Sequence, residues 1–253
     1  MAEIIKQIYK PSMNVGQVYA RPYGAAVAPM PIGNVLELSL EHTEDVQTQE
    51  DMTRLGGGTH AEVRRVKGVK VKLKLADLNV INYARSVLGT TQAIEGAAVV
   101  DEPHHAFLGG LLRLAHIQPT AVTLKKGADK ATATPVTATG NYEVRPEGIY
   151  LLPDATDIAN SNKLWASYTY GAYAAIEALT SKAPELELTF GGLNEADGGK
   201  PVLVEIWRAS QGITKTLALI SKGFGALDVE GSVLMDPTKV GTSISRFYKT
   251  SMA

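Results

Sequence analysis

Residues 62–89 read EVRRVKGVKVKLKLADLNVINYARSVLG, and the rest of the fold prediction is built outward from them. Over residues 69–75, apolar and lysine side chains alternate without a break, which is typical of a β-strand with one buried face. The period then becomes helical, with Asp77 placed as an N-cap and Gly89 as a C-terminal stop. We therefore expect a long strand that leads into one short amphipathic helix over residues 77–89.

The same alternation recurs on both sides of this stretch. Residues 35–41 place three leucines on one face and Glu37, Ser39 and Glu41 on the other. Residues 184–192 alternate in the same way, with Glu185, Glu187 and Thr189 on the polar face. Further strand candidates are residues 121–125, 141–145, 148–152, 163–170, 201–208, 214–220 and 226–235. Residues 201–208 are nearly continuously apolar, so we expect that strand to be buried on both faces.

Many short strands with one good helix predict a mainly β protein, a β-sandwich or β-barrel with a flanking helix. We expect one β domain over residues 35–239, between an irregular N-terminal arm at 1–34 and a C-terminal arm at 240–253. Within the domain, residues 42–60 break every pattern and are expected to form the long loop of a hairpin. Residues 90–118 match no pattern clearly.

Composition excludes several classes of protein. The 253 residues include 25 basic and 26 acidic ones, a balance that argues against a protein whose main task is to grip nucleic acid. The absence of cysteine excludes disulfides, thiolate metal sites and a cysteine nucleophile. There is no secretion signal and no apolar run near the ~20 residues that span a bilayer. We expect a soluble protein made in a reducing compartment.

No catalytic, cofactor or metal constellation is recognisable. The run Gly56-Gly57-Gly58-Thr59 lacks the spacing of a phosphate loop and is better explained as a flexible hairpin tip. The adjacent His104 and His105 face different ways on any regular element, and no third ligand has a suitable spacing. Carboxylate pairs occur only on strand faces, where they are more typical of solvated surface. We predict that the protein is not an enzyme and needs no cofactor.

The strongest charge feature is the lysine stripe Lys70, Lys72 and Lys74. It has three interpretations. The lysines could contact phosphate or an acidic partner, form a solvated face that protects a sheet edge, or pair with the glutamate stripes across neighbouring strands.

In order along the chain, these elements resemble the tail tube (major tail) proteins of long-tailed bacteriophages. The resemblance covers roughly residues 30–250, leaves residues 96–118 unaligned, and depends on the order of motifs that are weak individually. The matching motifs are residues 33–41 (GNVLELSLE), the acidic loop that ends in Gly-Gly-Gly-Thr, residues 65–79 (RVKGVKVKLKLADLN), 141–144 (NYEV), 168–170 (YTY), 190–194 (FGGLN) and 202–207 (VLVEIW).

The resemblance implies homohexameric rings that stack head to tail into a hollow tube in the virion tail, built from protein made in the host bacterial cytoplasm. DNA would pass through the lumen without specific binding, and the tape measure, tail terminator and tail tip proteins would be partners. No membrane insertion is implied. Alternatives are another ring-forming tail component such as a terminator or initiator, a secretion-system tube protein and, less favoured, a ligand-binding β-sandwich module.

Two sets of residues follow from this resemblance as candidates. The lumen face is expected to be acidic or neutral, and the lysine stripe to face elsewhere or to be neutralised by carboxylates. The candidate lumen residues are Glu37, Ser39, Glu41, Glu185, Glu187 and Thr189. The long loop is the candidate ring-stacking element, with Glu44, Asp45, Glu50, Asp51 and Arg54.

Overall fold

The computed structural model describes residues 11–253, which fold as a mainly β protein with 51% of residues in strands and 4% helical. It has several antiparallel sheets and, over those residues, a single α-helix, which confirms the predicted fold class. The chain divides into two compact units. Unit 1 comprises the residues up to Thr91 together with Ile176–Ala253, and unit 2 comprises Gln92–Ala175. The expected single domain over residues 35–239 is thus interrupted, because each unit has a hydrophobic core of its own.

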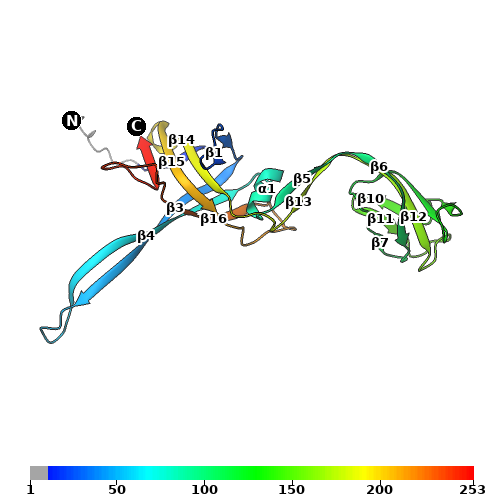
Figure 1. Cartoon of the computed structure of the whole chain (residues 1–253), viewed down its shortest axis with the longest axis horizontal. Coiled ribbons are helices and arrows are strands. Elements are labelled where there is room, and N and C mark those ends of the chain that lie inside the picture. The colour runs from blue at the N-terminus through cyan, green and yellow to red at the C-terminus, as the bar shows by residue number, and fades with distance from the viewer. Residues whose placement is uncertain (1–10) are drawn as a thin grey trace. The chain divides into compact units, whose positions relative to one another are not determined.

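Unit 1 is organised by one antiparallel sheet (Figure 1). Its strands follow one another in the order β2, β1, β14, β15, β16, β4, β3, while β17 also pairs with β15. The bounds are β1 Asn14–Pro22, β2 Met30–Pro31, β3 Val35–Glu50, β4 Thr59–Leu75, β14 Glu185–Asn194, β15 Lys200–Gln211, β16 Leu227–Val233 and β17 Tyr248–Met252. Over the described part of the chain, the sheet does not close into a barrel.

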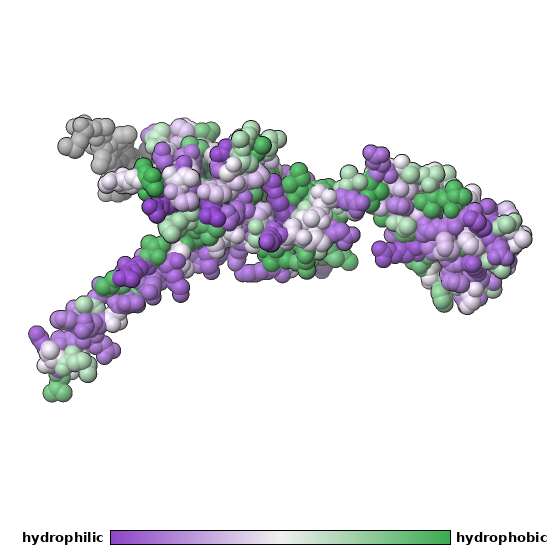
Figure 2. Space-filling model, viewed as in Figure 1, coloured by the Kyte–Doolittle hydropathy of each residue, from purple (hydrophilic) through white to green (hydrophobic). Residues whose placement is uncertain are grey.

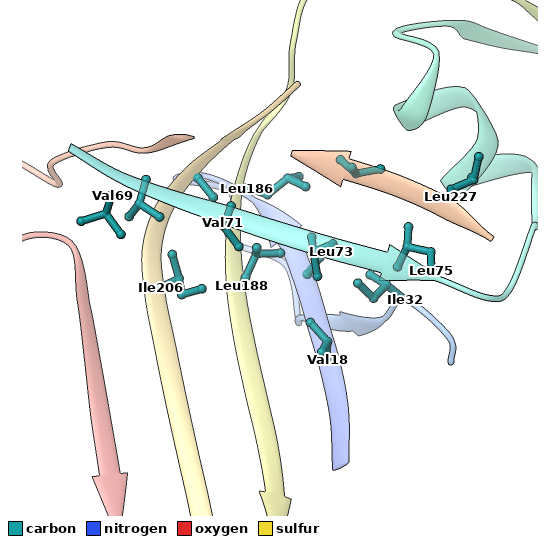
Figure 3. Packing of buried hydrophobic residues seen from close by; sticks show 14 residues of the cluster. Val18, Ile32, Val69, Val71, Leu73, Leu75, Leu186, Leu188, Ile206 and Leu227 are labelled. Atoms are coloured by element: carbon teal, nitrogen blue, oxygen red, sulfur yellow. The ribbon is translucent and has the colours of Figure 1, made fainter. Parts of the chain in front are cut away.

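One face of this sheet is dry. The apolar side chains of residues 69–75 are buried, as their alternation predicts, and pack against side chains of four other strands (Figure 3). This core gathers Val18, Ala20, Ile32, Val69, Val71, Leu73, Leu75, Leu186, Leu188, Ile206, Ala209, Leu227, Val229 and Val233. At about 1.5–3 kcal/mol for each fully buried large side chain, this face is the main source of stability of unit 1.

The helix lies where the period changes, but it is shorter than residues 77–89. Helix α1 spans Val80–Ser86, and its N-cap is Asn79, whose side chain accepts a hydrogen bond of 2.8 Å from the backbone N–H three residues on. Asp77, the expected cap, instead accepts a hydrogen bond of 2.8 Å from the backbone N–H of Asn34. The start of the helix is therefore tied to the chain that enters β3. A 3₁₀ turn, η1, spans Glu195–Asp197.

Strands of the sheet lie within both predicted arms, so neither arm is irregular along the whole of its described length. Strand β1 pairs with β14 along nine residues, from Asn14 opposite Asn194 to Pro22 opposite Leu186. Strand β17 pairs with the first half of β15, with Tyr248 opposite Ile206. Of the prolines and glycines that suggested irregular chain, Gly16 and Pro22 lie within β1 and Pro31 within β2. The prediction for residues 1–10 falls outside the described part of the chain.

The expected loop over residues 42–60 is mostly strand. The β3–β4 ladder continues from Val35 opposite Leu75 to Glu50 opposite Thr59, so the turn occupies only residues 51–58. Figure 1 shows the hairpin projecting from the body of unit 1. Both faces of this outer half are exposed, and a strand without a dry face has no apolar alternation to reveal it.

Two strand predictions need correction. Residues 214–220 do not form a strand, because Thr214 bonds through its N–H to Ser86 (2.8 Å) and through its hydroxyl to Asp228 (2.9 Å) instead of joining a ladder. Residues 201–208 lie in β15 but are not buried on both faces, since Leu203 remains 39% exposed.

Unit 2 is a small β-sandwich whose two sheets share one core. One sheet has the order β6, β12, β8, β9 and the other β10, β11, β7. Their bounds are β6 Ala97–His105, β7 Leu111–Leu112, β8 Thr120–Lys126, β9 Thr134–Val136, β10 Tyr142–Arg145, β11 Gly148–Leu151 and β12 Lys163–Tyr170. The core between them includes Leu124, Ile149 and Leu164. Strands β5 (Thr90–Ile94) and β13 (Tyr173–Glu177) pair with each other where the chain passes between the units.

Candidate assembly surfaces

The lysine stripe is flanked by carboxylates on both sides. In the β3–β4 ladder, Glu37 lies opposite Lys74 and Glu41 opposite Lys70, with Ser39 opposite Lys72 between them. On the other side of β4, strand β16 places Asp228 opposite Lys74 and Glu230 opposite Lys72. Residues directly opposite in a ladder point to the same face of a sheet. The three lysines therefore belong to a mixed-charge surface.

Ion pairs connect this surface across the strands. Lys72 lies 2.9 Å from Glu41, and Lys215 lies 2.7 Å from Glu230. The hydrogen bond between them and the charge of Lys72 lower the pKa of Glu41, and the same bond and the charge of Glu41 raise the pKa of Lys72. The hydrogen bond from Lys215 likewise lowers the pKa of Glu230. Of the three interpretations of the stripe, cross-strand pairing is the one that these contacts favour.

The second acidic stripe is matched by arginines. Arg208 donates two hydrogen bonds to Glu185, of 2.7 and 2.9 Å. The hydrogen bonding from Arg208 is the main cause that lowers the pKa of the Glu185 carboxyl. Arg21 donates from Nε to Glu187 at 2.7 Å. Thr189 lies opposite Glu205 of β15. Neither glutamate of this stripe presents an unbalanced negative charge.

Both acidic stripes and the lysine stripe lie on one face of the sheet. A single row crosses five strands in register, from Glu41 to Lys70, Ser232, Ser210 and Glu185. This face is opposite the buried core, and we call it the polar face. Of the two expectations for the lysine stripe, that it faces away from the acidic stripes or that carboxylates neutralise it, the shared face rules out the first, and the pair of Lys72 with Glu41 favours the second.

The outer half of the β3–β4 hairpin carries the candidate stacking residues. Arg64 links the strands through Glu44 at 3.3 Å and also contacts Glu62 at 2.5 Å. Asp45 lies opposite Arg65 in the ladder. Figure 2 shows this half as largely hydrophilic, with apolar residues at its tip. In this half, where both strands are exposed and no hydrophobic core forms, charged pairs between the strands stabilise the hairpin.

The hairpin tip has a defined local structure. The N–H of Asp51 donates to the carbonyl of Gly58 at 2.7 Å and closes the loop. The Asp51 carboxylate accepts from the hydroxyl and the N–H of Thr53, and both bonds lower its pKa. Arg54 lies 3.8 Å from Asp51, and Glu50 ends the ladder opposite Thr59. Gly56, Gly57 and Gly58 all have positive φ, which explains the glycine run by turn geometry.

The two histidines that the sequence offered as possible metal ligands do not form a metal site in the part of the chain that the structure describes. His104 and His105 lie at the end of β6, and His104 Nε2 contacts Glu102 Oε1 at 2.8 Å. Over residues 11–253, no group of three or more side chains could hold a metal ion.

A polar cluster in unit 2 escaped the sequence analysis. Glu102 accepts hydrogen bonds from the Tyr168 hydroxyl (2.6 Å) and the Ala115 N–H (3.1 Å), besides its contact with His104. Burial, followed by the bond to Glu102, raises the pKa of Tyr168. Glu102 and His104 of this cluster lie on β6, Tyr168 lies on β12, and Ala115 lies in the chain after β7. No spacing along the sequence could therefore reveal the cluster. The cluster is satisfied internally and supports the sandwich.

The comparisons with known proteins give one match. The family model described as "Protein of unknown function UCP028589" matches residues 11–251. No curated protein matches the chain. Within the described residues, no helix is long and apolar enough to cross a membrane.

Proposed function

The chain belongs to this family of proteins of unknown function, and we propose that it is a structural subunit that polymerises into the tail tube of a long-tailed bacteriophage. In this proposal, identical subunits form rings, and the rings stack head to tail into a hollow conduit for DNA. The hexameric ring number derives from the resemblance alone.

The observation that carries the proposal is the sheet of unit 1, which has a dry face, a charge-balanced face and free edges. Within the described residues, β3 pairs only with β4, and β17 only with β15. An unpaired edge offers a row of backbone donors and acceptors to another chain. Edges at two different positions allow head-to-tail contacts between identical subunits, and such contacts close into a ring when the rotation permits.

The polar face suits a surface that DNA passes. Its lysines lie opposite or beside carboxylates, and Glu41, Glu185 and Glu187 are paired with lysine or arginine. A strongly basic surface would hold DNA by releasing counterions, whereas a balanced surface gains little from such release. We assign the polar face to the lumen, so that Glu37, Ser39, Glu41, Glu185, Glu187 and Thr189 line it together with the lysine stripe.

In the assembled tail, the tape measure, tail terminator and tail tip proteins would be the partners that the resemblance implies. The exposed hairpin is the element that reaches the neighbouring ring. A subunit that ends up in the virion needs neither a cofactor nor a catalytic group.

The test is electron microscopy of the purified protein in negative stain across a concentration series, with and without an extract of tail tips. Rings or hollow tubes of even width are the expected result, and end-on views give the ring number. Cryo-EM of the tubes then shows whether Lys72 and Glu41 face the lumen as a pair. Monomers under all these conditions, tail-tip extract included, would refute the proposal.

A further inference from the structure

An exposed apolar loop lies beside helix α1 in unit 1. Residues 212–226 connect β15 to β16, and hydrogen bonds from Thr214 to Ser86 and to Asp228 hold the base of the loop. Leu217 packs against the core of unit 1. The loop thus starts from a fixed position.

Beyond Leu217 the loop presents large apolar side chains to solvent. Leu219 is 81% exposed, Ile220 96% and Phe224 fully exposed. Gly225 lies against Leu78, where an added Cβ would be 3.5 Å from the leucine Cδ1, and Leu78 and Ile81 at the start of α1 are exposed as well. We call the five exposed side chains Leu78, Ile81, Leu219, Ile220 and Phe224 the apolar loop patch. Figure 2 shows apolar surface gathered on this part of unit 1. A contiguous apolar surface of this kind marks an interaction site.

The hairpin tip carries the complementary side chains. Met52 is 84% exposed and Leu55 is fully exposed. Glu44 is paired with Arg64 and Asp51 with Arg54, so the carboxylate next to the turn that no ion pair holds, within the part of the chain that the structure describes, is Glu50. Residues 212–226 hold two lysines and no carboxylate. Lys215 is already paired with Glu230, which leaves Lys222, between Ile220 and Phe224, as the charge that the loop offers. An apolar tip flanked by Glu50 therefore matches an apolar loop that offers Lys222.

The two surfaces of one copy cannot meet. At about 3.3 Å per residue, the 17 residues of β4 span roughly 55 Å. The tip joins one end of β4, while α1 and the apolar loop patch lie by the other end, as Figure 1 shows within unit 1. Only a second copy can bring a tip to this patch.

We infer that the apolar loop patch is the surface on which the hairpin tip of the next copy docks. The inference deepens the proposed function and rests on it, since it names the two surfaces that join successive rings. The contact is heterologous: each copy uses its tip in one direction and its patch in the other. In this contact Lys222 faces Glu50 of the neighbouring copy, and Phe224 packs with Met52 and Leu55.

Cysteine cross-linking tests this directly, because the natural chain has no cysteine. Leu55→Cys and Phe224→Cys are prepared separately in the full chain, mixed under assembly conditions and oxidised with diamide. Both positions are fully exposed, so the fold tolerates the changes. We expect the mixture to cross-link at least roughly tenfold faster than a control mixture of Leu55→Cys with Val100→Cys, since docking raises the local thiol concentration. Val100, in unit 2, is 74% exposed and lies outside the patch.

A charge exchange gives a second measurement. Lys222→Glu and Glu50→Lys each slow the Leu55–Phe224 cross-link, and the two changes together restore it. Rings or tubes with no cross-linking above the Val100 control would overturn the inference while the proposed function stands. A protein that never assembles would overturn both. Binding to phosphatidylglycerol vesicles that Phe224→Ser abolishes, without cross-linking, would assign the patch to a lipid surface and overturn the inference.

Discussion

Replacing Ile149 by alanine should unfold unit 2 far more readily while leaving unit 1 intact. Ile149 is fully buried in β11, opposite Val144 of β10 and Leu112 of β7. Truncation removes three carbons, worth about 0.8 kcal/mol each by transfer. With the cavity that remains, isoleucine-to-alanine changes in cores cost about 2–5 kcal/mol, and we take about 3. For a unit of this size, that cost lowers the unfolding temperature by roughly 12–24 °C.

Hydrogen exchange with mass spectrometry on the full chain distinguishes the units. About 3 kcal/mol corresponds to exchange that is roughly 150-fold faster in the most protected amides of β8, β11 and β12, provided that they exchange through unfolding of unit 2. Amides of β4 and β15 should keep their rates. Ile206→Ala is the matched control, because Ile206 is buried in the core of unit 1 and its truncation should have the reverse effect. Equal acceleration in β4 and β11 by Ile149→Ala would show that the two cores unfold as one, and would refute the reasoning.

Three further predictions follow from single contacts. Gly192→Ala should destabilise unit 1 by about 1–3 kcal/mol in urea unfolding, because the added Cβ would meet the Phe190 ring and lie 2.5 Å from the Val15 carbonyl oxygen. Gly191→Ala is the control, since a Cβ there would enter open space and should have little effect. Similar losses of stability for both variants would contradict this reasoning. Asn79→Ala should lower stability by about 1 kcal/mol in the same assay through loss of the N-cap of α1, and an unchanged midpoint would reject that role. Arg208 lowers the pKa of Glu185 in the folded protein below its ordinary value of 4.5. The stability that this ion pair contributes is therefore fully present above pH 4.5 and is lost as the pH falls through the lowered pKa of the folded state. Urea midpoints measured from pH 7 to pH 3 should therefore fall less steeply for Glu185→Gln than for the natural protein, and parallel curves would exclude a contribution from this pair.

The sequence predicted best where one strand face is dry and the other wet. Residues 69–75 and 185–190 alternate because each strand separates core from solvent, and both lie in the sheet with the expected faces buried. The change of period located the helix. Its exact N-cap was missed because Asp77 and Asn79 are both suitable caps, and a backbone N–H from Asn34 decided between them.

What the sequence did not predict depends on distant partners. The outer half of the hairpin has two wet faces, so charged pairs such as Glu44 with Arg64 replace the alternation that would identify it. Strand β17 is defined by β15, more than forty residues away, and its own sequence carries no dry stripe. Unit 2 was not predicted as a separate domain, because its residues are inserted between the two segments of the chain that form unit 1. On the polar face, only the register shows that Glu41 and Glu185 share a row.

The order of strand pairing has a consequence for synthesis on the ribosome. Unit 2 is one continuous segment, so it can fold while the chain is still being made. The sheet of unit 1 cannot fold so early, because β1 pairs with β14, which follows unit 2 in the chain, and β15 pairs with β17, which follows later still. While unit 2 is being made, β1 therefore lacks β14, with which it pairs in the folded sheet, and the sheet of unit 1 is completed after unit 2.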